Sequence, residues 1–314
     1  MAIVPPSTEP GAVTLAPLVE TEPGAGPLIG AQRGLFRRGW DVFAQNRLGL
    51  VGLVTVVFMV LFSFVGPLFY RTDQVHNTLS NAVCTPSATH LLGCDSYGFD
   101  VLGRLMVAGQ TSLEVGFAAA IVAVLFGTLY GAISGFIGGP VDSLLMRIVD
   151  AGLSIPYITV LIILAVIFHP NRVIMILVIA VFYWLGVARL IRGETLSLRT
   201  REYVQAVKVA GGGRMRAVVR HIVPNAIGTI IVQATFAVAD SIIILASLGF
   251  LSLGVQFPDT DWGTMLAGGL QYLQAGGYWW LIYPAGLAII ITCISFNFIG
   301  DALRDAFETR LQRR

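Results

Sequence analysis

Long apolar stretches that contain almost no charged residue constrain the fold of this chain more than any other feature. About 20 consecutive apolar residues are needed to cross the hydrocarbon core of a bilayer. Charged residues make up 12% of the chain, against about a quarter in ordinary soluble domains. The apolar stretches are 48–70, 115–139, 151–168, 173–188, 222–253 (interrupted only by Asp240) and 279–300. We therefore expect an all-α membrane protein with six transmembrane helices.

The basic residues predict the orientation of these helices. Most arginines and the single lysine precede the first stretch, follow the last, or lie after the second and fourth, whereas Arg71, Arg104 and Arg172 fall on the opposite side. Loops rich in Lys and Arg stay on the cytoplasmic side of a membrane. Both termini are therefore expected to be cytoplasmic, in a multi-pass protein of a bacterial inner membrane.

Residues 202–225 form the most unusual segment between two apolar stretches. They read EYVQAVKVAGGGRMRAVVRHIVPN, which predicts two short helices, 202–210 and 214–221, around a glycine turn. Glycine tolerates the positive φ that a sharp reversal needs. Pro224 then ends the segment where the next apolar stretch begins.

This segment has two possible roles. Its arginines could merely enforce topology and contact anionic lipid, as basic loops commonly do. Alternatively, Val204, Val207, Val209 and Ala210 beside Arg201 and Lys208 would form an apolar surface with a charged rim, as in helices that dock into a groove of another protein. We favour docking, because such a surface would be wasted in a simple connector.

The same segment resembles the EAA loop of bacterial ABC-importer permeases. The resemblance rests on Gln205-Ala206-Val207, then Gly211, then 221–224 ending in Pro224. Gln205, Val207 and His221 depart from the usual residues, while the glycine and proline spacing is intact. The resemblance implies that the following residues couple the chain to an ATPase: Glu202, Gln205, Ala206, Val207, Lys208, Gly211 and Pro224.

Two further segments resemble permeases of the dipeptide, oligopeptide and nickel importer family. Residues 247–263, SLGFLSLGVQFPDTDWG, are similar to the segment that follows the fifth helix in that family. The other segment starts at His90 in the expected external loop, and within it Cys94 stands where the family usually has Thr. Its matching residues are His90, Leu92, Gly93, Asp95, Gly98, Asp100, Val101 and Arg104.

The chain is thus identified as a C-type permease subunit of that family, with type I ABC-importer architecture. The family implies a paralogous permease partner, two cytoplasmic ABC ATPases that bind ATP and Mg, and an external substrate-binding protein. The only lysine, Lys208, is followed by Val209, so no Gly-Lys-Ser/Thr phosphate loop exists in the chain. We expect a subunit that is not itself an enzyme and binds no cofactor. Peptide is the expected substrate, and nickel, haem or glutathione remain open.

These expectations give the following organisation along the chain. The Pro- and Gly-rich residues at the start lack the basic and apolar pattern of a signal peptide. Pro156 and Pro284 are expected to kink the third and sixth helices. The parts are a disordered cytoplasmic tail (1–30), an amphipathic surface helix and the first membrane helix (31–70), an external loop (71–111), a core with five membrane helices and the coupling loop 199–224 (112–302), and a basic cytoplasmic tail (303–314).

Asp240 is the only acidic residue well inside an apolar stretch. A charge at mid-membrane costs at least about 2.5 to 3.5 kcal/mol, so this side chain should face a cavity, a pore or a partner. It could belong to the substrate pathway, or it could form a structural hydrogen bond with a neighbouring helix. We lean slightly to the structural role, because one fixed charge is a poor receptor for peptides with many different side chains.

Cys84 and Cys94 lie ten positions apart in the expected external loop. A disulfide between them would contribute roughly 2 to 3 kcal/mol in an oxidising compartment. His90, Asp95, Asp100 and the cysteines could instead suggest a metal site, but no zinc-type spacing is present, so none is expected.

Two other classes of protein compete with the permease interpretation. A proton-driven secondary transporter could use Asp240 and Asp150, yet it would leave the paired helices of 202–225 without a purpose. A membrane-embedded hydrolase is disfavoured, because the chain has no Gly-x-Ser-x-Gly segment and no pair of intramembrane histidines.

Overall fold

The computed structural model describes residues 40, 42–74, 76, 78–168, 171–209, 213–272 and 276–308. Within these ranges the chain is helical and forms no strand, apart from an isolated β-bridge between Cys94 and Asp100. The expected tail 1–30, the first residues of the expected surface helix, Gly211 and the final residues lie outside the described part.

The long helices are α2 (Arg47–Phe64), α4 (Val101–Ile137), α7 (Arg172–Leu198), α11 (Ile227–Phe250) and α13 (Tyr283–Glu308). The shorter helices are α3 (Gly66–Phe69), α5 (Gly139–Ser154), α6 (Tyr157–Phe168), α8 (Glu202–Val209), α9 (Arg214–Ala217), α10 (Val223–Asn225) and α12 (Trp262–Leu270). Two 3₁₀ turns, η1 (Leu79–Asn81) and η3 (Trp279–Leu281), and a π-helical turn, η2 (Val218–Ile222), complete the list.

Five of these helices are long and apolar enough to cross a membrane, and a bent pair could supply a sixth span. The pair is α5 and α6, which meet at 77°. The kink expected at Pro156 is therefore confirmed, and the apolar stretch 151–168 is broken at this proline. Ile155 is extended, with ψ of 131°, because Pro156 disfavours the helical conformation of the residue before it.

Pro284 behaves differently from Pro156. It lies in the first turn of α13, directly after Tyr283, so it does not kink that helix as expected. Proline is tolerated in the first turn because its missing N–H has no partner there.

Helix α4 is longer than the sequence pattern suggested. The Asp100 carboxylate accepts a hydrogen bond from the backbone N–H of Gly103 at 2.8 Å, which caps the helix and starts it at Val101. Residues 101–111, expected as the last part of a loop, are therefore helical. Gly138, with φ of 69°, ends the helix.

Glycines allow α4 and α7 to pack closely. Gly127, Gly131 and Gly135 recur every fourth residue on the face of α4 that contacts α7. A Cβ atom at Gly131 would lie 2.2 Å from the carbonyl oxygen of Ala188. This is the small-xxx-small arrangement by which membrane helices approach each other.

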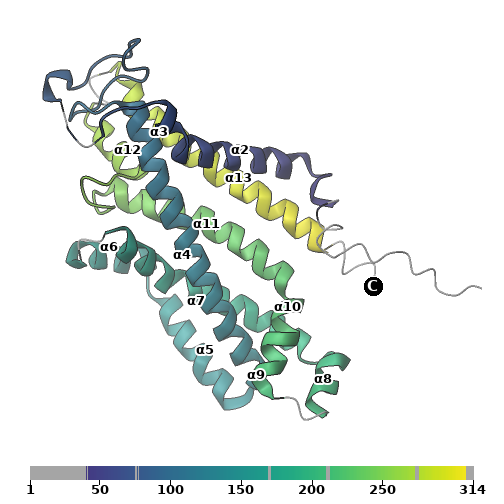
Figure 1. Cartoon of the computed structure of the whole chain (residues 1–314). Coiled ribbons are helices and arrows are strands. Elements are labelled where there is room, and N and C mark those ends of the chain that lie inside the picture. Colours follow the sequence, from purple (N-terminus) through teal and green to yellow (C-terminus); the bar gives the residue numbers. More distant parts are fainter. Residues whose placement is uncertain are drawn as a thin grey trace, which may run out of the picture.

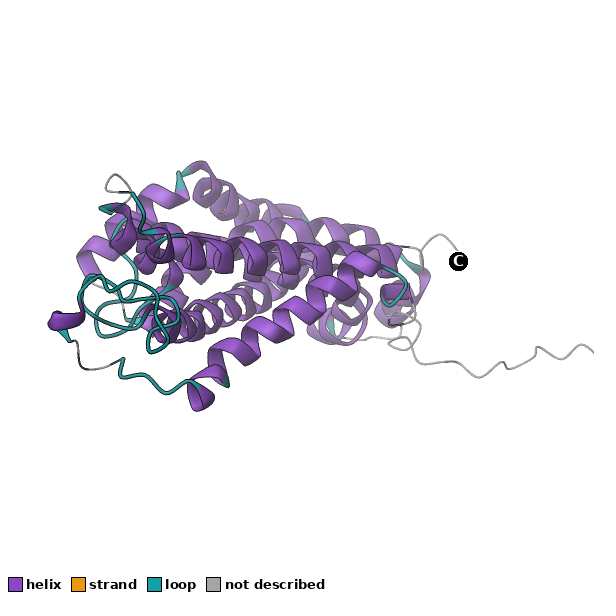
Figure 2. Cartoon of the chain, turned by 90° about the horizontal axis from the view of Figure 1, so that it is seen from above, coloured by secondary structure: helices purple, strands orange, loops and turns teal. Residues whose placement is uncertain are grey.

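The remaining long helices form a second layer beside this pair. Helix α2 packs against α13, α13 against α11, and α11 against α4 (Figure 1). Figure 1 places α3 and α12 at one end of the molecule, which we call the disulfide end, and α8 and α9 at the other, which we call the α8 end. Figure 2 shows most of the loops gathered near one end of the helices.

Candidate functional site

The α8 end is formed by residues 199–224, which leave α7 and return to α11 (Figure 1). Val204 is fully buried in the main hydrophobic core, together with Val218 and Ile222. The Gln205 side chain also donates a hydrogen bond to the carbonyl of Arg199 at 3.1 Å. These contacts anchor the segment to the helical bundle.

The exposed apolar residues of this segment differ from those expected. Val209 is 90% exposed and Met215 is 59% exposed. Val204 lies inside, because five residues at about 100° each separate it from Val209 around the helix. The expectation that the two valines share one surface is therefore wrong, and Met215 and Tyr203 are exposed apolar residues that were not expected there. Adjacent residues of a helix lie about 100° apart, so the helical period could have placed Tyr203 on a different face from buried Val204.

The other predicted coupling residues lie as follows. Glu202 is exposed at the start of α8, Ala206 is exposed, and Val207 is partly buried against the core. Pro224 is exposed in the first turn of α10. Gly211 and the side chain of Lys208 lie outside the described residues.

A lateral cavity of about 400 Å³ opens between the α5–α6 bend, α7 and α11. The bend contributes Ile155 and Tyr157, and α7 contributes Phe182 and Tyr183. Asp240 is one of the residues that α11 contributes. The 77° bend therefore shapes one wall of this cavity.

Asp240 both lines the cavity and contacts a neighbouring helix. The Tyr183 hydroxyl donates a hydrogen bond to Asp240 Oδ2 at 2.8 Å, and Gln233 Nε2 lies 3.4 Å from the same hydroxyl oxygen. Gln233 and Asp240 are seven positions apart, so they share one face of α11. The expected hydrogen bond to a neighbouring helix is present, whereas neither Tyr183 nor Gln233 was expected beside Asp240. The seven-residue spacing was the available signal for Gln233.

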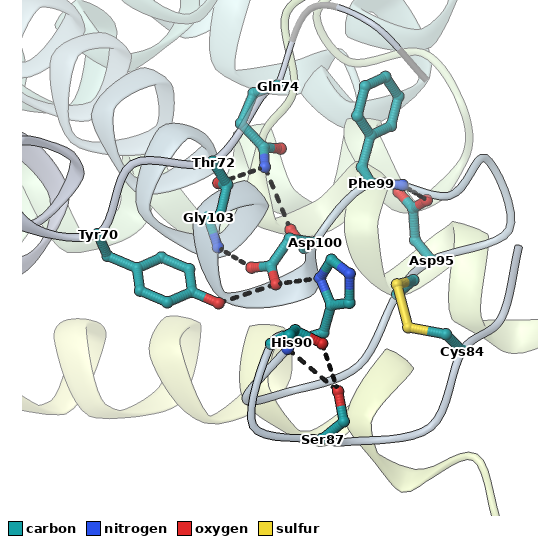
Figure 3. Close-up of polar contacts among 12 residues, drawn as sticks. Tyr70, Thr72, Gln74, Cys84, Ser87, His90, Asp95, Phe99, Asp100 and Gly103 are labelled. Atoms are coloured by element: carbon teal, nitrogen blue, oxygen red, sulfur yellow. Dashed lines mark hydrogen bonds and ion pairs between the residues drawn. A yellow bond between two sulfur atoms is a disulfide. The ribbon is translucent and has the colours of Figure 1, made fainter. Parts of the chain in front are cut away.

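The disulfide end is held together by a second polar network (Figure 3). Asp100 Oδ2 accepts a hydrogen bond from Tyr70 at 2.9 Å and lies 2.9 Å from His90 Nδ1. The structure joins Cys84 and Cys94 in a disulfide, with their Cα atoms 4.8 Å apart. His90 lies close to both sulfur atoms, but bonded sulfurs are not the thiolates that a zinc site needs.

Asp95 stabilises the turn that precedes α4. Its Oδ1 accepts hydrogen bonds from the backbone N–H groups of Tyr97 and Phe99, both at 2.9 Å. Burial nevertheless raises the pKa of Asp95 above its ordinary value. Arg104 contributes to the same site, with its guanidinium 4.5 Å from the centre of the Phe99 ring.

The fold and these sites define a multi-pass helical membrane protein with an anchored, partly apolar segment at one end and a polar group in a lateral cavity. Residues 123–313 match the family model described as the binding-protein-dependent transport system inner membrane component. Residues 34–82 match the N-terminal TM domain of oligopeptide transport permease C. The chain belongs to this family of binding-protein-dependent permeases, which confirms the resemblance found in the sequence.

Curated relatives cover most of the chain. The dipeptide transport system permease protein DppC of Bacillus subtilis is 36% identical over 274 residues, which are 87% of this chain and 85% of the relative. The oligopeptide transport system permease protein OppC of Bacillus subtilis is 38% identical over 271 residues, covering 86% and 88%. OppC of Escherichia coli K12 is 37% identical over 280 residues, covering 88% and 92%.

Proposed function

We propose that this chain is a permease subunit of an ATP-driven peptide importer and forms half of a translocation pathway in a bacterial inner membrane. The observation that carries this proposal is its similarity, over more than four fifths of the chain, to permeases named for dipeptide and oligopeptide transport. Peptide is therefore favoured over nickel, haem or glutathione. Both termini and the α8 end would be cytoplasmic, in line with the basic residues there.

The partners follow from the same family. A paralogous permease would supply the other half of the pathway, and a substrate-binding protein would deliver peptides at the disulfide end. Two ATPase subunits would bind ATP and Mg and dock at the α8 end. This chain would form part of the path that the peptide follows, and its partners would hydrolyse ATP.

The α8 end has the properties that such docking requires. Val209 and Met215 present apolar surface to solvent, while Val204 fixes the same segment to the core. A partner that binds the exposed side and moves would therefore displace α7 and α11 with it. ATP binding would draw the two ATPases together, and this displacement would turn the pathway outward.

A substitution at Val209 tests this proposal. In reconstituted importer, Val209→Asp is expected to weaken co-purification of the ATPase subunits and to reduce ATP-driven peptide uptake, because it places a charge in the docking surface. Val209→Ala, which keeps the site apolar, is the matched control and should behave nearly as the unsubstituted chain. Gly211→Val is expected to remove ATP-driven uptake while insertion and subunit assembly stay intact, because a β-branched residue resists the backbone conformation of the turn.

Two results would contradict the proposal. One is normal ATPase binding and uptake with Val209→Asp. The other is uptake by the purified chain alone, driven by a proton gradient without ATP, which would support a secondary transporter instead.

A further inference from the structure

Asp240 is an acidic residue with no basic residue on its own helix. It lies near the middle of α11 (Ile227–Phe250) and is the only charged residue of that helix. A carboxylate at such a depth costs at least about 2.5 to 3.5 kcal/mol unless water or a counter-charge compensates it. The compensation would have to come from a cationic side chain of a neighbouring helix, from water or from a ligand.

The neighbouring helix α7 and the residue that caps its C-terminus, Arg199, supply several arginines, yet these are engaged elsewhere. Arg172 pairs with Glu114 and Asp259, and Arg189 pairs with Asp150. Arg192 pairs with Asp142, and Arg199 donates to the carbonyl of Gly135. Within the described part of the chain, no cationic side chain lies within ion-pair distance of Asp240.

The hydrogen bond from Tyr183 orients Asp240 without neutralising it. The hydroxyl contacts Oδ2 at 2.8 Å, and Oδ1 accepts no hydrogen bond from any residue that the structure describes. Because Asp240 is exposed to the cavity, Oδ1 is available to a ligand. The tyrosine thus holds one oxygen of the carboxylate in place, while the second oxygen can accept a hydrogen bond from a ligand.

The rest of the cavity suits a small cationic ligand. Its volume of about 400 Å³ falls within the usual range of ligand sites, about 300 to 1,000 Å³. Tyr157, Phe182 and Tyr183 supply aromatic rings, whose faces attract ammonium groups. Gln233 adds an amide that can bond to a peptide backbone. No arginine, lysine or histidine is among the described residues that line the cavity.

We propose that Asp240 binds the protonated amino terminus of the peptide as it passes through the cavity, with Tyr183 holding the carboxylate in position. This inference rests on the proposed function. Every unmodified peptide carries an amino terminus whatever its side chains are. One fixed acid can therefore serve many peptides, which removes the objection that a single charge is a poor general receptor.

The test separates charge from shape. Asp240→Asn keeps the size of the side chain and an acceptor for Tyr183 but removes the charge. Asp240→Glu keeps the charge but lengthens the side chain. Uptake of radiolabelled Ala-Ala, which has no cationic side chain, is measured in the reconstituted importer and normalised to the amount of assembled complex. Asp301→Asn, an exposed acid on α13 outside the cavity lining, is the matched control.

We expect Asp240→Asn to lower Ala-Ala uptake by about tenfold or more, which corresponds to about 1.4 kcal/mol if read as a barrier change. Asp240→Glu should stay within about threefold of the unsubstituted importer, and Asp301→Asn should not change uptake. A nearly neutral Asn with a harmful Glu would overturn the proposal in favour of a structural hydrogen bond. A loss restricted to lysine-containing peptides would overturn it too, because the ligand would then be a side chain.

The outcome also separates this inference from the proposed function. If the unsubstituted importer takes up Ala-Ala in an ATP-dependent manner and Asp240→Asn does the same at the same rate, only the role of Asp240 is wrong. If the unsubstituted importer shows no ATP-dependent peptide uptake at all, the proposed function itself fails.

Discussion

The guanidinium group of Arg192 forms two parallel hydrogen bonds with the carboxylate of Asp142, 2.7 Å from Nε to Oδ1 and 2.6 Å from Nη2 to Oδ2. Ser134 donates a third hydrogen bond to Oδ1 at 2.6 Å. Three helices, α4, α5 and α7, therefore meet at one nearly buried acid. A second pair between α5 and α7, Asp150 with Arg189, has both side chains more than half exposed.

These two pairs predict different losses for the same chemical change. Asp142→Asn should lower the free energy of unfolding in detergent by about 1.5 to 3 kcal/mol, because it weakens hydrogen bonds to a charged, poorly hydrated group. Asp150→Asn, the matched control, should cost less than about 1 kcal/mol, since exposed ion pairs contribute little. Thermal or chemical unfolding measures both losses. Equal losses would show that the buried pair does not stabilise the fold more than the exposed pair.

The close contact between α4 and α7 predicts that two glycine-to-alanine substitutions have different effects on stability. Gly131→Ala should destabilise the protein by about 1 to 3 kcal/mol, because the new Cβ would force the two backbones apart. Gly193→Ala on α7 meets no atom within 4 Å and should be neutral or stabilising by up to about 1 kcal/mol. Unfolding measurements on both variants check the prediction, and a harmless Gly131→Ala would contradict the close packing.

The disulfide at the disulfide end can be tested by mass mapping under non-reducing conditions. The expected product is a linked pair of fragments that contain Cys84 and Cys94, and replacing both by Ser should lower stability by roughly 2 to 3 kcal/mol. Cys293, which is buried, is the internal control and should be alkylated only after unfolding. Finding Cys84 and Cys94 as free thiols in the native protein would end this prediction.

Asp261 predicts a dependence of stability on pH. Its carboxylate is fully buried at the start of α12 and accepts hydrogen bonds from the backbone N–H and the hydroxyl of Thr264. Burial outweighs these bonds and raises the pKa of Asp261 above its ordinary value of 3.8. Protonation therefore favours the folded state, so the stabilising contribution is complete below the ordinary pKa and is lost as pH rises through the raised one.

Asp261→Asn removes this titration and keeps a good helix cap. The stability of the unsubstituted protein relative to this variant should therefore fall as pH rises from below 3.8 through the raised pKa. Unfolding in detergent at a series of pH values measures the difference. Parallel pH profiles for the two proteins would contradict the raised pKa.

The sequence was sufficient for the local features of this fold. Apolar stretches of the right length locate the long helices, and Asp100 before Val101 is a capping signal that could also have placed the start of α4. The break at Pro156 follows from backbone chemistry, although its angle does not. Family resemblance, carried by short spaced motifs such as 205–211, was confirmed by comparison.

Contacts between helices could not be predicted in the same way. Tyr183 and Asp240 are 57 positions apart, and their meeting depends on how α7 and α11 are rotated and shifted against each other. The same holds for the choice of acid partner by each arginine of α7. The inward direction of Val204 depends on the core it packs against, so the local charge pattern was a poor guide to it.

Helix α4 runs without a break for 37 residues, which is about 55 Å at 1.5 Å per residue. The hydrocarbon core of a membrane is only about 30 Å thick, so this helix must tilt or extend well beyond it. Its first turn is tied to the Asp100 network. Near its other end, Ser134 donates a hydrogen bond to Asp142, which also pairs with Arg192, and the carbonyl of Gly135 accepts one from Arg199. This one continuous helix therefore links the disulfide end to the region near the α8 end within a single subunit.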